Sequence, residues 1–110
     1  MIFFINEQET SVENIIKNAI YNRNQLDIVY EGTNRRIAPY HLGHTKKGNY
    51  ALMAYQFSGF TLTENNNFKI LIVGKISKAT IVEGSTFEID PKYRPNGDEV
   101  VSIEYQINFN

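Results

Sequence analysis

The chain has 110 residues, of which 42% are hydrophobic and 13% aromatic, and its formal net charge is −1. This length fits one domain, and the near-neutral globular composition excludes a disordered tail and a bulk polycation that coats nucleic acid. The lack of cysteine in the sequence excludes disulfide scaffolds, thiolate zinc sites and cysteine nucleophiles. The longest apolar runs are far below the roughly 20 residues of a membrane helix. We therefore expect a cytoplasmic single domain over residues 1–110.

A helix is predicted over about residues 10–22. Thr10 and Glu13 fit a capping box, in which the Thr hydroxyl satisfies a free amide of the first turn and the Glu side chain reaches back. Apolar residues then recur at the i, i+3, i+4, i+7 and i+8 spacing of one buried helical stripe. The stripe consists of Val12, Ile15, Ile16, Ala19 and Ile20.

The chain from residue 25 onward has the pattern of strands joined by turns. Glu31-Gly32-Thr33-Asn34 is turn chemistry between two strand-like segments, which predicts a hairpin. Pro39 implies an edge, a bend or a bulge, and Gly74 inside a later apolar strand is best interpreted as a bulge. The predicted strands cover residues 25–31, 35–43, 50–57, 68–76 and 101–109, and residues 86–89 are a short strand or a turn.

The last strand has the clearest pattern. Apolar residues alternate with polar ones from Val101 to Phe109, as in a strand that buries one face. The short apolar segment Ile2–Ile5 is expected to pair with it. One helix followed by successive hairpins predicts a mostly β fold, which is a small curled antiparallel sheet or barrel with one packed N-terminal helix.

Charge is distributed unevenly along the sequence. Residues 17–78 hold nine basic and three acidic residues, and nine minus three gives a formal charge of +6, whereas both flanks are acidic. A basic middle can form a face that attracts anions on a neutral protein. With tyrosines nearby, such a face suits single-stranded nucleic acid, because phosphates contact the cations and bases stack on the rings. In the alternative interpretation, the tyrosines fill the core and the lysines protect edge strands.

Four segments share one pattern when they are taken in chain order. They are Ile15-Ile16-Lys17-Asn18-Ala19-Ile20 with Leu26-Asp27-Ile28-Val29-Tyr30, then Arg35-Arg36-Ile37-Ala38-Pro39-Tyr40-His41-Leu42, then Gly48-Asn49-Tyr50-Ala51-Leu52-Met53-Ala54-Tyr55, and finally Lys69-Ile70-Leu71-Ile72-Val73-Gly74-Lys75-Ile76. Together they resemble the WYL domain of bacteria and phages, with its helix and I-x-Y strand, R-x-V-x-P-x-x-L strand, G-x-W-Y-L-V-A-Y segment and R-T-F-R-L-D-R-I segment.

The resemblance implies an Sm-like, SH3-type β-barrel with an N-terminal helix. It also implies a ligand-sensing module of transcription regulators or phage-defence systems, with a basic pocket for nucleic-acid-derived or other anionic ligands. About nine residues precede the predicted helix, so we expect a stand-alone domain without a helix-turn-helix. The expected ligand-binding residues are Tyr30, Arg35, Arg36, His41, Tyr50, Lys69 and Lys75.

The basic residues of the expected pocket depend on strand register. Lys69 and Lys75 stand where the family has arginine, so they keep the charge but lack the planar fork that binds phosphate bidentately. They are six residues apart and share a face if one strand carries both. Arg35 and His41 also share a face if Pro39 does not shift the register.

Other classes of function have less support in the sequence. His41 and His44 have no acidic residue at a metal-ligand spacing, and the chain contains no nucleophile elbow and no glycine-rich phosphate loop. We therefore expect no enzyme activity, no metal and no cofactor. The expected partners are single-stranded nucleic acid or a nucleotide-type ligand, and a separate effector protein. The alternative is a structural or interaction protein that forms homodimers or hetero-oligomers through its β-edges without a small ligand.

Overall fold

The structure, a computed structural model, describes residues 11–59, 68–94 and 100–107. Helix α2 spans Val12–Asn22, and its N-cap is Ser11, whose hydroxyl accepts from the Asn14 amide. The helix prediction is confirmed, but the N-cap is Ser11 rather than the predicted Thr10, which itself lies outside the described residues. Three residues of the predicted stripe are buried, namely Ile16, Ala19 and Ile20. In the part of the chain that is described, no helix is long and apolar enough to cross a membrane.

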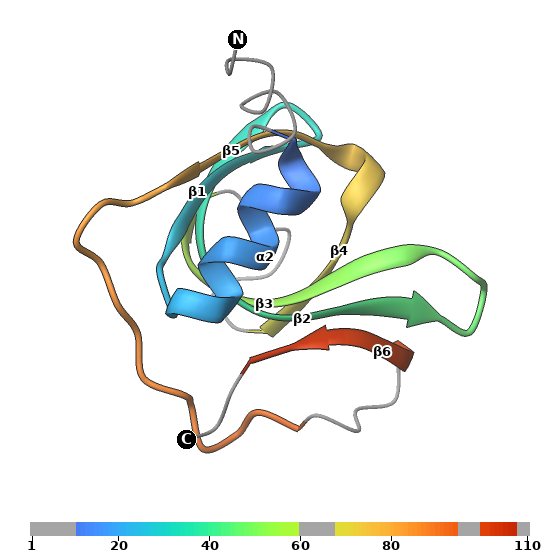
Figure 1. The fold of residues 1–110 in the computed structure, drawn as a ribbon. Helices are drawn as coiled ribbons and strands as arrows, with labels where there is room; N and C mark the ends of the chain where they lie inside the picture. The colour runs from blue at the N-terminus through green and yellow to red at the C-terminus, as the bar shows by residue number, and fades with distance from the viewer. Residues whose placement is uncertain (1–10, 60–67, 95–99, 108–110) are drawn as a thin grey trace, which may run out of the picture.

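The strands form a sheet in which every described pairing is antiparallel. The sheet order is β4-β3-β2-β1-β5, and β6 pairs with β2. The long β2 pairs with β3 along one edge, and with β1 and then β6 along the other (Figure 1). The bounds are β1 Leu26–Tyr30, β2 Thr33–Thr45, β3 Tyr50–Gly59, β4 Phe68–Ile72, β5 Ile76–Ile81 and β6 Val100–Gln106.

The two strands at the ends of the sheet order, β4 and β5, follow each other in the chain. The 3-10 turn Val73–Lys75 joins β4 directly to β5. Figure 1 shows that the sheet is curled and that α2 lies in front of it. The single predicted strand over residues 68–76 is therefore wrong, and Gly74 belongs to a turn rather than to a bulge within a strand. The mostly antiparallel sheet with one helix is confirmed. The described pairings do not join β4 to β5, so they do not confirm a closed barrel.

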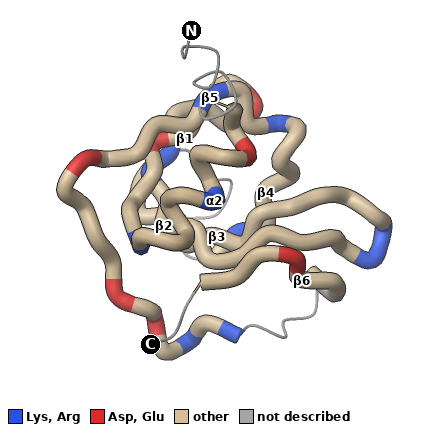
Figure 2. Tube along the Cα trace, in the orientation of Figure 1, with Lys and Arg blue, Asp and Glu red and all other residues tan. Residues whose placement is uncertain are grey.

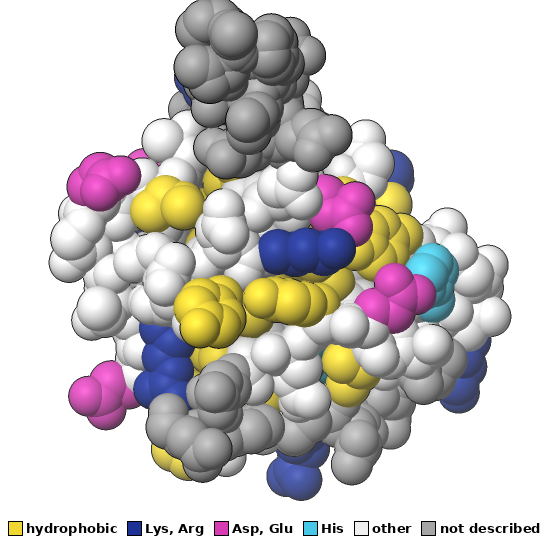
Figure 3. All heavy atoms as spheres, in the orientation of Figure 1, with side chains coloured by type: hydrophobic (Ala, Val, Ile, Leu, Met, Phe, Trp, Pro, Cys, Tyr) yellow, Lys and Arg dark blue, Asp and Glu magenta, His cyan; other side chains and the backbone are white. Residues whose placement is uncertain are grey.

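Helix α2 covers one side of the curled sheet, where it contacts β2, β5 and β6. Its buried stripe joins a core that includes Leu26, Ile28 and Ile37. On this side, hydrophobic side chains reach the surface around a basic one (Figure 3). The Lys17 ammonium lies 5.9 Å from the ring centroid of Tyr105, so helix and β6 are also joined by a cation–π contact.

A register shift interrupts the pairing of β2 with β3 just after Pro39. Pro39 lies opposite Ala54, whereas His41 lies opposite Met53, so Tyr40 is the extra residue. Such a bulge moves the following side chains to the other face. Of the three alternatives at Pro39, an edge, a bend or a bulge, the structure shows the bulge. Arg35 and His41 were expected to share a face only without a register shift, and this condition is not met.

The C-terminal third lies against an aromatic cluster centred on Tyr40. The Tyr40 ring centroid is 5.2 Å from that of Phe68, 5.3 Å from Phe87 and 4.4 Å from Tyr93. The Tyr40 hydroxyl accepts from the Asp90 amide at 2.9 Å. Residues 86–89 belong to no strand, because side-chain packing rather than strand pairing holds this segment.

The final strand shows the predicted alternation over its described part. Ser102, Glu104 and Gln106 are exposed, whereas Ile103 and Tyr105 are half-buried. The strand ends at Gln106 rather than at residue 109, and residues 108–110 lie outside the described part. The segment Ile2–Ile5, expected to pair with this strand, also lies outside the described residues.

Candidate anion-binding site

Arg35 is held in place by groups from three strands, β1, β2 and β3. Its guanidinium carbon lies 4.9 Å from the centroid of the Tyr30 ring, within the range of a cation–π interaction. Nε donates to the Thr33 hydroxyl at 3.2 Å, and Nη1 donates to the Gln56 side-chain oxygen at 3.3 Å. We call Tyr30, Thr33, Arg35 and Gln56 the Arg35 cluster. It lies on the face of the sheet that carries the core residue Ile28, which is the inner face.

The tight turn between β1 and β2 brings Tyr30 and Arg35 together. Glu31 and Gly32 have φ angles of 49° and 82°, and positive φ at both central residues is typical of a two-residue hairpin turn. The register pairs Tyr30 with Thr33, and Arg35 shares the inner face because alternate strand residues do so. The Thr33 hydroxyl also donates to the Tyr30 carbonyl oxygen at 2.9 Å. The hairpin turn therefore fixes the Arg35 guanidinium against the Tyr30 ring.

The register of β3 and β4 places Lys69 next to the Arg35 cluster. Lys69 lies opposite Ala54, and Ala54 shares a face with Gln56 because the two are two residues apart on one strand. Lys69 and Arg35 therefore lie on either side of Gln56 on the inner face. The structure brings these two predicted cations and Tyr30 to one region.

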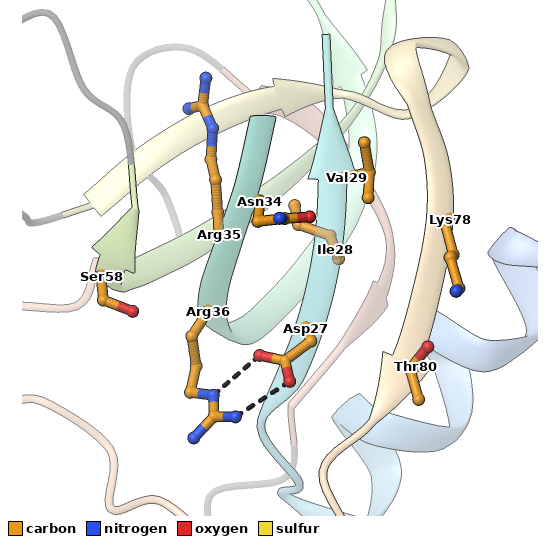
Figure 4. Close-up of a pocket in the computed structure, with 9 residues that line it drawn as sticks. All are labelled: Asp27, Ile28, Val29, Asn34, Arg35, Arg36, Ser58, Lys78 and Thr80. Atoms are coloured by element: carbon orange, nitrogen blue, oxygen red, sulfur yellow. Dashed lines mark hydrogen bonds and ion pairs between the residues drawn. The ribbon is translucent and has the colours of Figure 1, made fainter. Parts of the chain in front are cut away.

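Arg36 points away from this region although it follows Arg35 in the chain. Its Nε and Nη2 donate to the two carboxylate oxygens of Asp27 at 2.8 and 2.9 Å. Figure 4 shows the side chains of Arg35 and Arg36 pointing in opposite directions from β2, as expected for consecutive strand residues. The hydrogen bond from Arg36 lowers the pKa of the Asp27 carboxyl. The charge of Arg36 is thus compensated, whereas among the described residues no carboxylate contacts Arg35.

An open groove of about 500 Å³ lies on the outer face of β1, β2 and β5. Arg36 and Ser58 line one side and Lys78 and Thr80 the other, with Asp27 between them (Figure 4). Ile28 and Arg35 also border the groove, although the register places their side chains on the inner face. In this groove Nε and Nη2 of Arg36 already donate to the Asp27 carboxylate, so the guanidinium has fewer donors and no uncompensated charge for an anion. The Arg35 cluster is therefore the better candidate for an anion site.

Lys75 lies beside the Arg35 cluster, but Glu31 compensates its charge. It lies in the 3-10 turn, and its ammonium is 3.3 Å from the Glu31 carboxylate. The expectation that Lys69 and Lys75 share a strand face is wrong, because β4 ends at Ile72 before the chain reaches Lys75. The Ile72 amide donates to the Tyr30 hydroxyl at 3.0 Å, which ties this turn to the cluster.

The two histidines lie away from the cluster and from each other. His41 is fully buried, its Nδ1 is 2.5 Å from the Tyr93 hydroxyl, and burial lowers its pKa to about 4. It is therefore neutral at pH 7 and supplies no charge to an anion. His44 is half-exposed and its Nδ1 lies 2.9 Å from a Glu104 carboxylate oxygen. Neither histidine adds to the cations of the inner face.

Tyr50 joins the helix to the sheet. Its hydroxyl donates to Glu13 of α2 at 2.8 Å, and burial together with this hydrogen bond raises the pKa of the phenol. Tyr50 and Gln56 are six residues apart on β3, which corresponds to about 20 Å along a strand. The structure therefore does not bring Tyr50 to the Arg35 cluster.

Gln56 belongs to the cluster although it was not among the predicted site residues. Its side chain is completely buried, in the strand that was predicted over residues 50–57. A polar residue at such a position requires a hydrogen-bond partner, and this requirement is the signal that identifies it.

The remaining cations do not gather around the cluster. Figure 2 shows Lys and Arg on several sides of the molecule, including the turn between β2 and β3, so the basic middle of the chain does not form one face.

Comparison with known proteins identifies a shared fold. No protein-family model matches the sequence, and no curated protein matches it significantly. Among solved structures, the chain is similar to proteasome accessory factor B/C (PafBC) of Arthrobacter aurescens, with a TM-score of 0.62 and 11% sequence identity. The similarity covers 77% of this chain and 13% of that chain. The chain therefore shares its fold with one part of PafBC and spans a small fraction of its length.

Proposed function

We propose that the chain is a ligand-sensing regulatory module of the WYL type, in which the Arg35 cluster and Lys69 bind a nucleic-acid-derived or other anionic ligand. One observation carries the proposal. Arg35 is half-buried and fixed over the Tyr30 ring, and among the described residues only neutral groups contact its guanidinium. A cation in such a partly desolvated site attracts an anion more strongly than one in open water does.

The shared fold supports the regulatory part of the proposal. This chain has the fold of one part of PafBC, and four of its own sequence segments resemble the WYL domain, which implies a regulatory ligand-sensing module. In the proposal, the curled sheet is an Sm-like, SH3-type barrel. The module acts in the cytoplasm, in transcription control or phage defence, and transmits ligand binding to a separate effector protein.

The geometry of Arg35 favours an oxyanion as the ligand group. Nε and one Nη1 hydrogen are taken by Thr33 and Gln56, which leaves the Nη2 hydrogens and a second Nη1 hydrogen as donors. Phosphate and carboxylate oxygens are the strongest acceptors for such donors, and Lys69 adds a second positive charge. One face of the Tyr30 ring is occupied by the guanidinium, so Tyr30 holds Arg35 there rather than stacking on a base.

Fluorescence anisotropy of labelled single-stranded DNA of roughly 10 nucleotides, at two salt concentrations, tests this proposal. Duplex DNA and mononucleotides serve as competitors. The double variant R35A/K69A is expected to bind at least about tenfold more weakly, because it loses two phosphate contacts. Its salt slope is expected to be shallower by about 1.4, since each neutralised phosphate of a single strand contributes about 0.7.

The matched control is R36A. It is compared with the single variant R35A, because each removes one positive charge, and in R36A this charge lies on the opposite face, where Asp27 already compensates it. We expect R36A to bind like the wild type. The proposal is wrong if R36A loses as much affinity as R35A, or if the double variant keeps the affinity and salt slope of the wild type.

A further inference from the structure

The cations of this chain differ in the groups that compensate them. Three other cations of the described structure each contact a carboxylate, whereas the side-chain oxygen that contacts the Arg35 guanidinium across β2 and β3 is the amide oxygen of Gln56. An amide oxygen accepts a hydrogen bond but brings no charge. Arg35 is thus oriented without being neutralised. The carboxylate pairs used in this comparison are Lys17 with Glu13 at 3.2 Å, Arg36 with Asp27 at 2.8 Å and Lys75 with Glu31 at 3.3 Å.

Gln56 is built rigidly into the sheet. It lies opposite Ile37 on the inner face, and none of its side chain is exposed. A fully buried amide must keep its hydrogen bonds, because an unpaired polar group in the interior is costly. The position of the Gln56 oxygen therefore fixes the direction in which the Arg35 guanidinium presents its remaining donors.

We propose that Gln56 is the positioning and specificity-determining residue of this anion site. Its neutral amide aims Arg35 and leaves the positive charge for the ligand, so the site takes a ligand that presents an anionic oxygen and rejects a neutral one. A carboxylate at position 56 has almost the same shape and occupies Arg35 as an internal anion. This inference rests on the proposed function and assigns to Gln56 the selection of ligand charge.

Two substitutions of Gln56 separate charge from orientation while Arg35 stays in place. Q56E is expected to weaken binding of the labelled single-stranded DNA by roughly 10- to 100-fold, the equivalent of one charged hydrogen bond, and to make the salt slope shallower. Q56M keeps the charge of Arg35 but removes the acceptor. We expect Q56M to weaken binding by about threefold to tenfold, the equivalent of one neutral hydrogen bond, with the salt slope of the wild type.

The matched control is S58E, which adds the same charge to the same strand. Ser58 is exposed and lies opposite Arg36 on the outer face, so S58E is expected to bind like the wild type. Inorganic pyrophosphate is expected to compete with the DNA on wild-type protein, whereas a nucleoside without phosphate is not. Circular dichroism and thermal unfolding establish that each variant is folded.

The outcomes distinguish this inference from the proposed function. If the wild type does not bind DNA or pyrophosphate, the proposed function fails and the inference fails with it. If R35A/K69A loses binding but Q56E keeps it, the inference alone is overturned. If Q56E does not fold, Q56M decides: reduced affinity with an unchanged salt slope supports the positioning role, and wild-type affinity contradicts it.

Discussion

Arg35 and Arg36 are neighbours in the chain, yet the sheet gives them different chemistry. Arg36 lies on the outer face, where the Asp27 carboxylate compensates its charge. Arg35 lies on the inner face, where the ring of Tyr30 and the amide of Gln56 hold it without an opposite charge. The difference teaches that a basic residue becomes a candidate ligand site through the groups around it, and that a count of basic residues does not identify one.

The largest effect is expected from removing the Tyr30 ring, which lies against the Arg35 guanidinium. Tyr30 is buried, and its hydroxyl accepts from the Ile72 amide, so Y30A is expected to lower the free energy of unfolding by about 3 kcal/mol or more. Y30F keeps the ring and loses one hydrogen bond, at a cost of about 1 kcal/mol. Urea unfolding measures both. Equal losses in the two variants would show that the hydrogen bond, rather than the ring, holds this end of the sheet.

The buried His41 makes the stability of the protein depend on pH. The folded state holds His41 neutral, with a pKa of about 4 against an ordinary value of 6.5. Between these values the unfolded chain binds more protons, so the free energy of unfolding falls as the pH is lowered from about 6.5 toward 4. The loss is on the order of 3 kcal/mol.

Denaturant unfolding at several pH values checks this expectation. H41Q is expected to flatten the dependence between pH 6.5 and 4, because it removes the titrating group. The wild type and H41Q are expected to converge in slope above pH 7. An unchanged slope in H41Q would assign the acid sensitivity to other groups.

The smallest expected effect comes from releasing Arg36. D27N removes the carboxylate of a half-exposed ion pair, so we expect a loss of about 0.5 kcal/mol in the free energy of unfolding. Anisotropy with labelled single-stranded DNA is expected to change by less than about threefold, an amount equivalent to well under 1 kcal/mol. D27N gives Arg36 an uncompensated charge without a ring or a buried amide to orient it. A large gain in affinity would show that charge alone makes the site.

Local patterns in the sequence were sufficient for several parts of the structure. The apolar stripe from Val12 to Ile20 predicts helix α2, because spacing along a helix is a local property. The alternation that begins at Val101 predicts β6 for the same reason. Pro39 predicts the bulge in β2, since proline interrupts a strand wherever the fold places it. Arg35 was also among the predicted site residues.

The face on which a side chain lies could not be obtained in the same way. The bulge after Pro39 separates His41 from Arg35, and the turn after Ile72 removes Lys75 from the strand that carries Lys69. A shift of one residue in register moves every following side chain to the other face. Such shifts depend on pairing with distant strands, so a pattern within one segment does not contain them.

By itself, the sequence determined a mostly β fold with one amphipathic helix, a turn at Glu31-Gly32 and an excess of basic residues in the middle of the chain. The tertiary structure decided that Asp27 compensates Arg36 whereas Arg35 keeps its charge available. Gln56 reaches Arg35 across β2 and β3 although they are 21 positions apart in the chain, whereas Asp27 reaches Arg36 across β1 and β2. The physical reason is that compensation of a charge is a contact between strands, and only the folded sheet brings those strands together.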